Sequence, residues 1–277
     1  MWEVIFWPVM AGVLLPGILI YLGIHVVRRE IIFIDLALAQ IASLGTCTAV
    51  LLDKELTSPA TFWISLGFTL VGAGVFSIVK TQKGRVPLEA VIGIAYVMAA
   101  AAAVLMLSRA AEGNEQIRNM LVGNILLVTP AEVWKTFALF AAVAVLHWIF
   151  RRKFLLISFE PEKAGELGLR VRAWDFLFYA VFGLVVTSFV RIAGVLLVFT
   201  YLIVPAVCGI LLFRNLKAQF VTGYFIAIAA GIGGILLSFW ADLPTGAAMV
   251  CTFGALLIAV AIGCWVWNRM GRRLGRH

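Results

Sequence analysis

The stretch RRKFLLISFEPEKAGELGLRVRA, residues 151–173, is the only long polar interruption in an otherwise apolar sequence. The chain is 63% apolar and 13% charged, with a mean hydropathy of +1.06, which lies far outside the composition of soluble domains. We therefore expect an all-α polytopic membrane protein that forms a single domain over residues 1–277. The polar stretch is then a cytoplasmic segment, centred on about residues 158–170.

The apolar runs set the expected number of transmembrane helices, because a helix needs about 20 mostly apolar residues to cross a bilayer. Runs of suitable length cover residues 4–24, 31–52, 58–79, 86–107, 131–150, 174–190, 192–212, 219–239 and 243–267. We therefore expect eight to nine transmembrane helices. The apolar segment 117–128 is too short to cross, and the sequence leaves open whether it re-enters the bundle as a half-helix.

Charge distribution predicts the orientation, because Lys and Arg gather in cytoplasmic loops. Placing the N-terminus outside and the C-terminus in the cytoplasm puts 17 of the 22 Lys and Arg residues on the cytoplasmic side. The net charge of +8 follows from this topology, so we expect no nucleic-acid partner. The basic C-terminal tail is instead suited to contact with anionic membrane lipid.

Motifs of catalysis are missing from the sequence. It contains no GxxxxGK[ST] phosphate loop, no HExxH and no GxSxG, and it has three histidines, His25, His147 and His277. We expect no catalytic residues and no enzymatic activity in this chain. If ATP drives the protein, a separate chain hydrolyses it.

Polar residues inside apolar segments mark the candidate translocation path, because they are costly there and usually functional. The candidates are Asp35, Gln40 and Glu89, with Asp35 as the candidate metal ligand. Asp35 and Gln40 are five residues apart, which separates them by about 140° around a helix, so one helix cannot aim both at one ion.

Both acids of this candidate path can also be explained by ion pairs without a role in transport. Asp35 is equally explained as an interfacial acid paired with Arg28 or Arg29. Glu89 is explained as a partner of Lys83 or Arg85 near the start of its helix.

Two further segments have residues that shape the backbone. Pro205 lies in the middle of an apolar run with Gly194 before it, and a proline there is expected to kink the helix, as a moving gate or as a static bend. Asp242, Pro244 and Gly246 form a tight turn between the last two spans, where Asp242 is expected to cap the following helix.

Residues 160–168 have the features of a short helix. Pro161 suits a first helical turn, the acids Glu160 and Glu162 favour the N-terminal half, and Gly168 can end the helix. Such a helix, with Ala164 at its centre, is suited to docking in a groove of a cytoplasmic partner.

Five segments together resemble one family over nearly the whole chain: RIAGVLLVFTYLIVPA (191–206), LLSFWADLPTGAAMV (236–250), GNILLVT (123–129), EAVIGI (89–94) and FEPEKAGELGL (159–169). The chain resembles the permeases of zinc, manganese and iron ABC importers. Glu162, Ala164 and Gly168 match the E-x-A-x-x-x-G pattern of ABC-importer coupling helices.

This resemblance implies a type II importer fold, similar to the vitamin B12 permeases, in the plasma (inner) membrane of a bacterium. It implies a homodimeric or paired permease, two cytoplasmic ATPase subunits that bind ATP, and an extracytoplasmic metal-binding protein. The cargo would be a divalent metal ion, and the chain itself would hold no cofactor.

One departure from the family pattern concerns the path. The family typically has Asp-Ala-Leu-Ser-His in the second span, and alignment on Gly45 places Leu36 at the Asp position and Gln40 at the His position. An amide is a poor zinc ligand compared with imidazole. Either the pore conducts metal without holding it tightly, or the cargo is a metal chelate or small organic nutrient.

Two other classes remain as alternatives. An ion-coupled secondary transporter would use Asp35 and Glu89 as proton carriers and would need no ATPase. A non-transporting membrane assembly factor would tolerate substitution of Asp35, Gln40 and Pro205.

Overall fold

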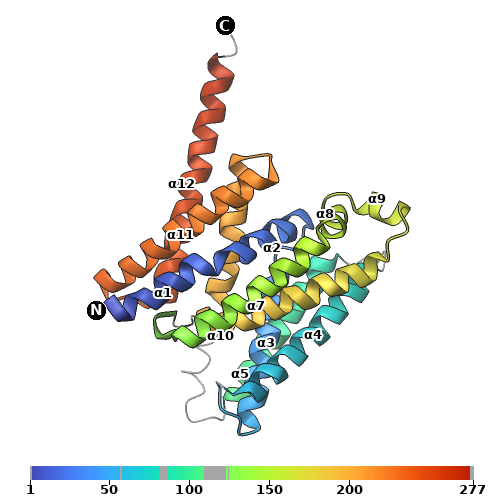
Figure 1. Cartoon of the computed structure of the whole chain (residues 1–277), viewed down its shortest axis with the longest axis vertical. Helices are drawn as coiled ribbons and strands as arrows, with labels where there is room; N and C mark the ends of the chain where they lie inside the picture. Colours follow the sequence, from blue (N-terminus) through green and yellow to red (C-terminus); the bar gives the residue numbers. More distant parts are fainter. Residues whose placement is uncertain (1, 57, 82–86, 109–122, 124, 275–277) are drawn as a thin grey trace.

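The computed structural model describes residues 2–56, 58–81, 87–108, 123 and 125–274, and these residues are almost entirely helical (Figure 1). The helices are α1 (Trp2–Leu14), α2 (Pro16–Arg28), α3 (Ile34–Leu51), α4 (Pro59–Thr81), α5 (Leu88–Leu107), η1 (Ile125–Leu127), α7 (Pro130–Ile149), α8 (Arg151–Phe159), α9 (Pro161–Glu166), α10 (Val171–Leu212), α11 (Leu216–Ala241) and α12 (Thr245–Leu274). Within the described ranges, seven helices are long and apolar enough to cross a membrane, or up to eight if the bent pair α1 and α2 forms one span. The chain is therefore a multi-pass helical membrane protein.

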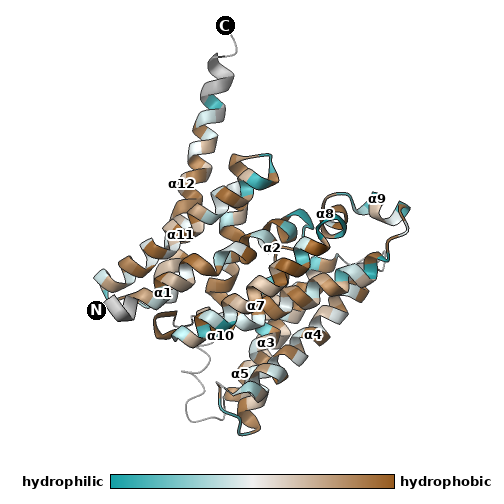
Figure 2. Ribbon diagram, viewed as in Figure 1, coloured by the Kyte–Doolittle hydropathy of each residue, from teal (hydrophilic) through white to brown (hydrophobic). Residues whose placement is uncertain are grey.

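Apolar residues dominate the long helices, and the most hydrophilic residues lie mainly near helix ends and in the connections between helices (Figure 2). The shared core lies where α10 packs against α2, α3, α4, α11 and α12. Close approach between these helices depends on small residues, since a methyl group at Gly23 or Gly223 would overlap the backbone carbonyl of Leu202 or Pro205. Helix α12 runs past the rest of the bundle toward the C-terminus (Figure 1).

The first predicted span is broken. Residues Phe6–Leu14 and Pro16–Arg28 meet at an angle of 41°, and Pro16 occupies the first turn of α2. Proline has no N–H to continue the hydrogen bonds of the preceding helix but suits a helix start, so the chain ends one helix and begins another.

Helix α10 is 42 residues long and contains one residue with non-helical backbone angles, Gly194, at φ 75° and ψ 166°. These angles are accessible essentially to glycine alone. The rings of Phe189 and Tyr201 lie 5.8 Å apart, although twelve residues of straight helix would separate their Cα atoms by about 18 Å. The chain therefore changes direction sharply at Gly194, and Figure 1 shows the two arms of α10 running in different directions.

The sharpest change of direction in α10 was not predicted from the sequence. Pro205 was expected to kink the helix, and its backbone angles are helical, as those of a proline in a kinked helix also are. The reversal lies eleven residues earlier, at Gly194, because it needs a positive φ that proline cannot adopt. The predicted runs 174–190 and 192–212 are the two arms on either side of the break.

The short apolar segment 117–128 is described only in part. Residues 117–122 and 124 lie outside the described residues, and Ile125–Leu127 forms a single 3₁₀ turn, η1. Gly123, with φ +66°, sits directly against the backbone of Ala193 and Gly194. The end of this segment therefore packs against the reversal in α10.

Candidate functional site

Helix α9 has the start and end that its sequence predicts. Pro161 occupies its first turn, and Gly168 follows its end with φ +71°. The Gly168 N–H donates to the Gly165 carbonyl at 3.0 Å and the Leu169 N–H donates to the Ala164 carbonyl at 3.2 Å. This pair of hydrogen bonds is a Schellman motif, which fixes the direction of the chain leaving the helix.

The side chains of α9 divide by exposure. Ala164 is fully buried, whereas Glu160, Glu162 and Leu167 are exposed. Lys163 forms an ion pair with Glu160 at 2.9 Å, but both side chains are more than half exposed, so the pair adds little stability. Helix α9 therefore rests on the protein through one small residue and presents acidic groups and Leu167 outward.

Helix α8, immediately before α9, was not foreseen from the sequence, which suggested a single short helix in this segment. Phe154, Ile157 and Ser158 are buried, and the Phe154 ring stacks on His147 with centroids 4.4 Å apart. These side chains lie on one face of the helix, since Ile157 and Ser158 follow Phe154 by three and four residues. Helix α8 is thus an amphipathic anchor for α9.

A buried polar network fastens α8 to the bundle; we call Arg29, Ser158, Asp175 and His25 the anchor network. Arg29 Nη1 donates to Asp175 Oδ1 at 2.6 Å, and both side chains are at most 2% exposed. Arg29 Nε donates to Ser158 Oγ at 2.8 Å, and Ser158 Oγ lies 2.7 Å from His25 Nδ1. The network therefore joins the end of α2, the end of α8 and the start of α10.

The positive charge of Arg29 in the anchor network is stabilised by its pairing with Asp175. Burial lowers the pKa of Arg29, and the neighbouring Asp175 carboxylate opposes that shift. The Arg29 guanidinium also lies 3.9 Å from the centre of the Phe178 ring, a cation–π contact. Removing one member of a buried ion pair leaves an uncompensated charge, so Arg29 and Asp175 depend on each other.

Asp175 was missed as a candidate although it begins the apolar run 174–190. The rule that singled out Asp35, that acids inside apolar spans are costly, applies to Asp175 as well. Its partner Arg29 lies 146 residues away, so the pairing itself has no local signal.

Asp35, the candidate metal ligand, is fully buried near the start of α3. Its Oδ1 accepts from the Leu36 N–H at 2.8 Å, and its Oδ2 has no hydrogen-bond partner among the described residues. The alternative pairing with Arg28 or Arg29 is wrong, because Arg29 is held by Asp175 and Arg28 lies over the Phe159 ring. Asp35 is therefore a buried acid without a counter-ion in the described part of the chain.

The other path candidates form no hydrogen bond or ion pair with Asp35 among the described residues. Gln40 is 5% exposed and its Oε1 has no hydrogen-bond partner among the described residues. Glu89 is exposed in the first turn of α5, and its alternative partners Lys83 and Arg85 lie outside the described residues. Within the described residues, no hydrogen bond or ion pair joins two of the three candidates, and no group of three or more His, Cys, Asp or Glu side chains is arranged to hold a metal ion.

The turn at residues 242–246 differs from the expectation in one detail. Asp242 does not cap α12: it ends α11 in the left-handed conformation, with φ 50°, and its N–H donates to the Ser238 carbonyl. Helix α12 begins at Thr245, so Pro244 precedes it. Ser238 fastens the turn instead, donating to the Leu243 carbonyl at 2.6 Å, with its Oγ 2.8 Å from Thr245 Oγ1.

Comparisons with known proteins agree on one family. The model of the ABC 3 transport family matches residues 1–263. The chain is 30% identical to the manganese transport system membrane protein MntC of Listeria innocua over 65% of this chain and 66% of that protein. It is 26% identical to the chelated iron transport system membrane protein YfeD of Yersinia pestis over 73% of this chain and 69% of that protein.

Solved structures share the fold. The structure of PsaBC from Streptococcus pneumoniae in complex with Fab matches with a TM-score of 0.78 at 19% identity, covering 93% of this chain and 91% of that chain. An inward-facing putative metal-chelate type ABC transporter matches with a TM-score of 0.72 at 18% identity, covering 94% and 88%. The alignments with the two Listeria MntC proteins span 66% of those proteins, just under two thirds of their length.

Proposed function

Because the chain belongs to the ABC 3 transport family, we propose that it is the membrane permease of an ABC importer for a divalent metal ion. Separate cytoplasmic subunits bind and hydrolyse ATP, so this chain is a transport subunit and not an enzyme. Relatives named for manganese and for chelated iron favour manganese and iron over zinc as cargo. An extracytoplasmic binding protein delivers the ion to a homodimeric or paired permease.

The observation that carries this proposal is the attachment of α9 to the bundle. Helix α9 presents Glu162 and Leu167 outward, as a docking helix for an ATPase subunit would. Its neighbour α8 is tied through Ser158 to Arg29, and Arg29 is tied to Asp175 of α10. Movement of a docked ATPase would therefore be passed through α8 to both α2 and α10.

The topology that fits this role has nine spans in one permease domain of the type II importer class. Helices α1 and α2 form one broken span, and α10 crosses twice, with its reversal at Gly194. The N-terminus is then outside and the C-terminus cytoplasmic. The distribution of Lys and Arg supports this orientation in the membrane, since it puts 17 of the 22 on the cytoplasmic side.

Asp35 is the residue we assign to the cation path. A buried carboxylate without a counter-ion attracts a passing cation, which supplies the missing positive charge. Gln40 lies on the same helix as Asp35 and contributes a neutral amide. Glu89 is exposed at the start of α5, and we assign it to the cytoplasmic exit of the path. The turn containing Asp242, Pro244 and Gly246 is the surface we assign to the binding protein.

A second candidate cargo is a metal chelate. Gln40 offers an amide where the family has an imidazole, and the described residues hold no three-ligand cluster. A weakly coordinating path suits a cargo whose metal is already coordinated by its carrier.

The experiment is ATP-dependent uptake of radiolabelled manganese, iron and zinc into vesicles that contain this chain with its ATPase and binding protein. We expect uptake of manganese or iron by the wild type and its loss in Glu162→Arg, because the reversed charge prevents docking of α9. The control is Glu55→Arg, which makes the same change at an exposed residue in the α3–α4 connection and should leave uptake intact.

Three outcomes decide among the proposals. Uptake that survives Glu162→Arg would contradict the coupling role of α9. No uptake of any free metal, with active ATPase, would contradict the free-ion proposal and favour the chelate. If Gln40→His then raises uptake of one free metal, the missing imidazole sets the selectivity.

A further inference from the structure

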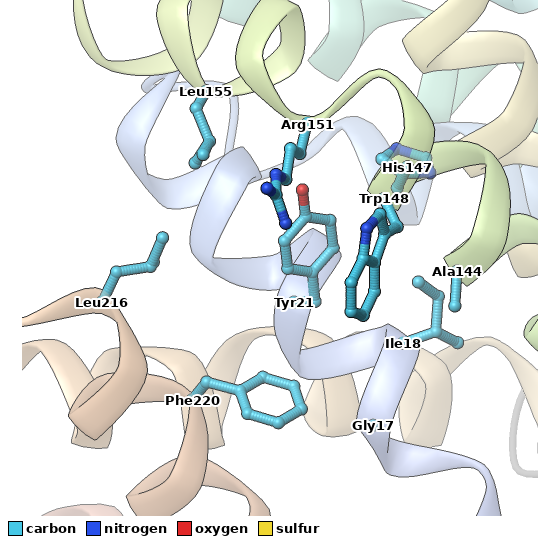
Figure 3. Close-up of a pocket in the computed structure, with 10 residues that line it drawn as sticks. All are labelled: Gly17, Ile18, Tyr21, Ala144, His147, Trp148, Arg151, Leu155, Leu216 and Phe220. Atoms are coloured by element: carbon cyan, nitrogen blue, oxygen red, sulfur yellow. The ribbon is translucent and has the colours of Figure 1, made fainter.

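A groove with a volume of about 460 Å³ lies where α2, α7, α8 and α11 meet, away from Asp35. It is lined by Gly17, Ile18, Tyr21, Ala144, His147, Trp148, Arg151, Leu155, Leu216 and Phe220 (Figure 3). The Tyr21 hydroxyl and the Arg151 guanidinium lie at one end of the groove, and Phe220 lies toward the other (Figure 3). The groove is therefore amphipathic along its length.

The polar end continues into a second hollow that shares Trp148 and Arg151 with the groove. This hollow has a volume of about 550 Å³ and is also lined by Arg152 and Lys153. Acidic side chains line neither hollow, and Arg151, Arg152 and Lys153 form no ion pair with another described residue. The polar end therefore carries three positive charges that the described part of the chain leaves uncompensated.

The position of the groove relative to the spans indicates the environment of each end. Helix α7 ends at Ile149, and α8 begins at Arg151, so the cations lie just beyond the end of a span. Trp148 is 71% exposed at this boundary, and the Arg151 guanidinium lies 5.5 Å from the centre of its ring. Trp and basic residues at a helix end mark the membrane–water boundary. The apolar end thus faces the acyl region, and the cationic end faces the headgroups.

We propose that this groove is a binding site for one anionic phospholipid. An acyl chain lies along Ile18 and Phe220, and the phosphate lies against Arg151. The apolar lining disfavours a small hydrophilic anion, whereas the three cations favour an anionic over a zwitterionic headgroup. His147 adds a buried Nε2 atom in the groove wall that has no hydrogen-bond partner among the described residues.

The site has a structural consequence, because its walls include α2 and α8, the two helices that the anchor network joins. A bound lipid fills the space beside that junction. The inference goes beyond the proposed transport function and does not depend on the identity of the cargo.

The experiment is native mass spectrometry of the full-length chain released from micelles with equal amounts of phosphatidylglycerol and phosphatidylcholine. We expect the wild type to retain phosphatidylglycerol at least about fivefold over phosphatidylcholine, since one basic residue near anionic lipid alone provides a fivefold preference. Gly17→Leu should abolish the preference by filling the groove, since an added Cβ there meets open space. Arg151→Gln should lower it about fivefold by removing one of the three cations, and Arg151→Lys should preserve it.

Two matched controls separate the groove from general surface effects. Gly93→Leu places the same side chain at another open helix position, on α5, and Arg172→Gln removes an exposed cation at the start of α10. Both should retain the wild-type preference. Equal retention of the two lipids by the wild type, or equal losses in Gly93→Leu and Gly17→Leu, would overturn the proposal. If Gly17→Leu does not fold, the comparison of Arg151→Gln with Arg151→Lys decides it.

Discussion

Asp175 and Asp35 are both buried acids in helices of one bundle, yet their surroundings differ. Asp175 forms an ion pair with Arg29 at 2.6 Å, and the same arginine donates to Ser158. Asp35 has one hydrogen bond to its own helix and a second oxygen without a partner among the described residues. The first region has compensated charge and joins three helices, whereas the second region keeps an acid whose second oxygen has no partner among the described residues.

The difference separates two reasons for burying an acid. A compensated charge costs little while its partner is present but becomes expensive when the partner is lost. An uncompensated acid inside a span costs stability in every state, so its presence points to a role in function. Substitutions at the two sites should therefore have opposite effects on stability and on transport.

The largest expected effect is at the compensated site. Asp175→Asn should lower the free energy of unfolding by about 3–5 kcal/mol, because Arg29 is left charged and buried. Thermal unfolding of the purified protein in detergent, followed by tryptophan fluorescence, measures this. Adding Arg29→Met to Asp175→Asn should recover most of the loss. A loss no larger than that of Asp35→Asn would remove the distinction between the two acids.

A smaller loss of stability is expected at Ser158, the residue of the anchor network that lies on α8. Ser158→Ala should cost about 1.5–3 kcal/mol, because the Arg29 Nε donor loses its acceptor in a buried site. Uptake per ATP hydrolysed should fall as well, since Ser158 joins α8 to α2. Ser108→Ala, which removes an exposed hydroxyl bonded to its own helix, is the control and should change neither quantity. Tight coupling in Ser158→Ala would show that α8 transmits force by another contact.

At Asp35, which has no counter-ion among the described residues, substitution should reduce metal uptake without reducing stability. Asp35→Asn should leave stability unchanged or raised, since it removes a buried ionisable group that has no counter-ion among the described residues. Metal uptake should fall about tenfold, equivalent to about 1.4 kcal/mol of lost attraction for the cation. Asp53→Asn, which neutralises an exposed acid at the end of the same helix, is the control in the uptake assay. Wild-type uptake in Asp35→Asn would assign the path to other residues.

The smallest effect concerns the end of α9. Gly168→Ala should cost about 1 kcal/mol, because φ at this position is +71° and alanine rarely adopts it. Gly165→Ala, three residues earlier in helical conformation with open space around it, should have no cost. Amide hydrogen exchange of the peptide covering residues 160–169 compares the two variants. Equal protection in both would mean that the contacts of Ala164, and not the Schellman motif, hold α9.

Local signals predicted much of the fold. The apolar runs 31–52, 86–107 and 131–150 match α3, α5 and α7 to within a few residues, because a run of apolar side chains is a property of the local sequence. The end of α9 was also predicted from the local sequence, because Gly168, which follows the helix, readily adopts a positive φ. The family resemblance was visible in the same short segments and agrees with the match to the ABC 3 transport family.

Predictions that depended on how distant segments pack were less successful. The reversal at Gly194, where Gly123 packs against the backbone, was not predicted, and the kink expected at Pro205 stays a prediction. The expected capping of α12 by Asp242 gave way to hydrogen bonds from Ser238, on the preceding helix. Helix α8 was missed because its apolar face is short and lies among basic residues.

The sequence by itself determined that the chain is a multi-pass helical membrane protein, where most of its spans lie, and that residues 160–168 contain a short acidic helix. Only the tertiary structure decided which buried acid is compensated, because Arg29 and Asp175 are 146 residues apart and no local pattern pairs them. Composition and periodicity predict whether a segment lies in lipid or in water, because these are properties of the local sequence. The partner of a buried charged group depends on which helices pack together, and this packing leaves Asp35 without a counter-ion among the described residues.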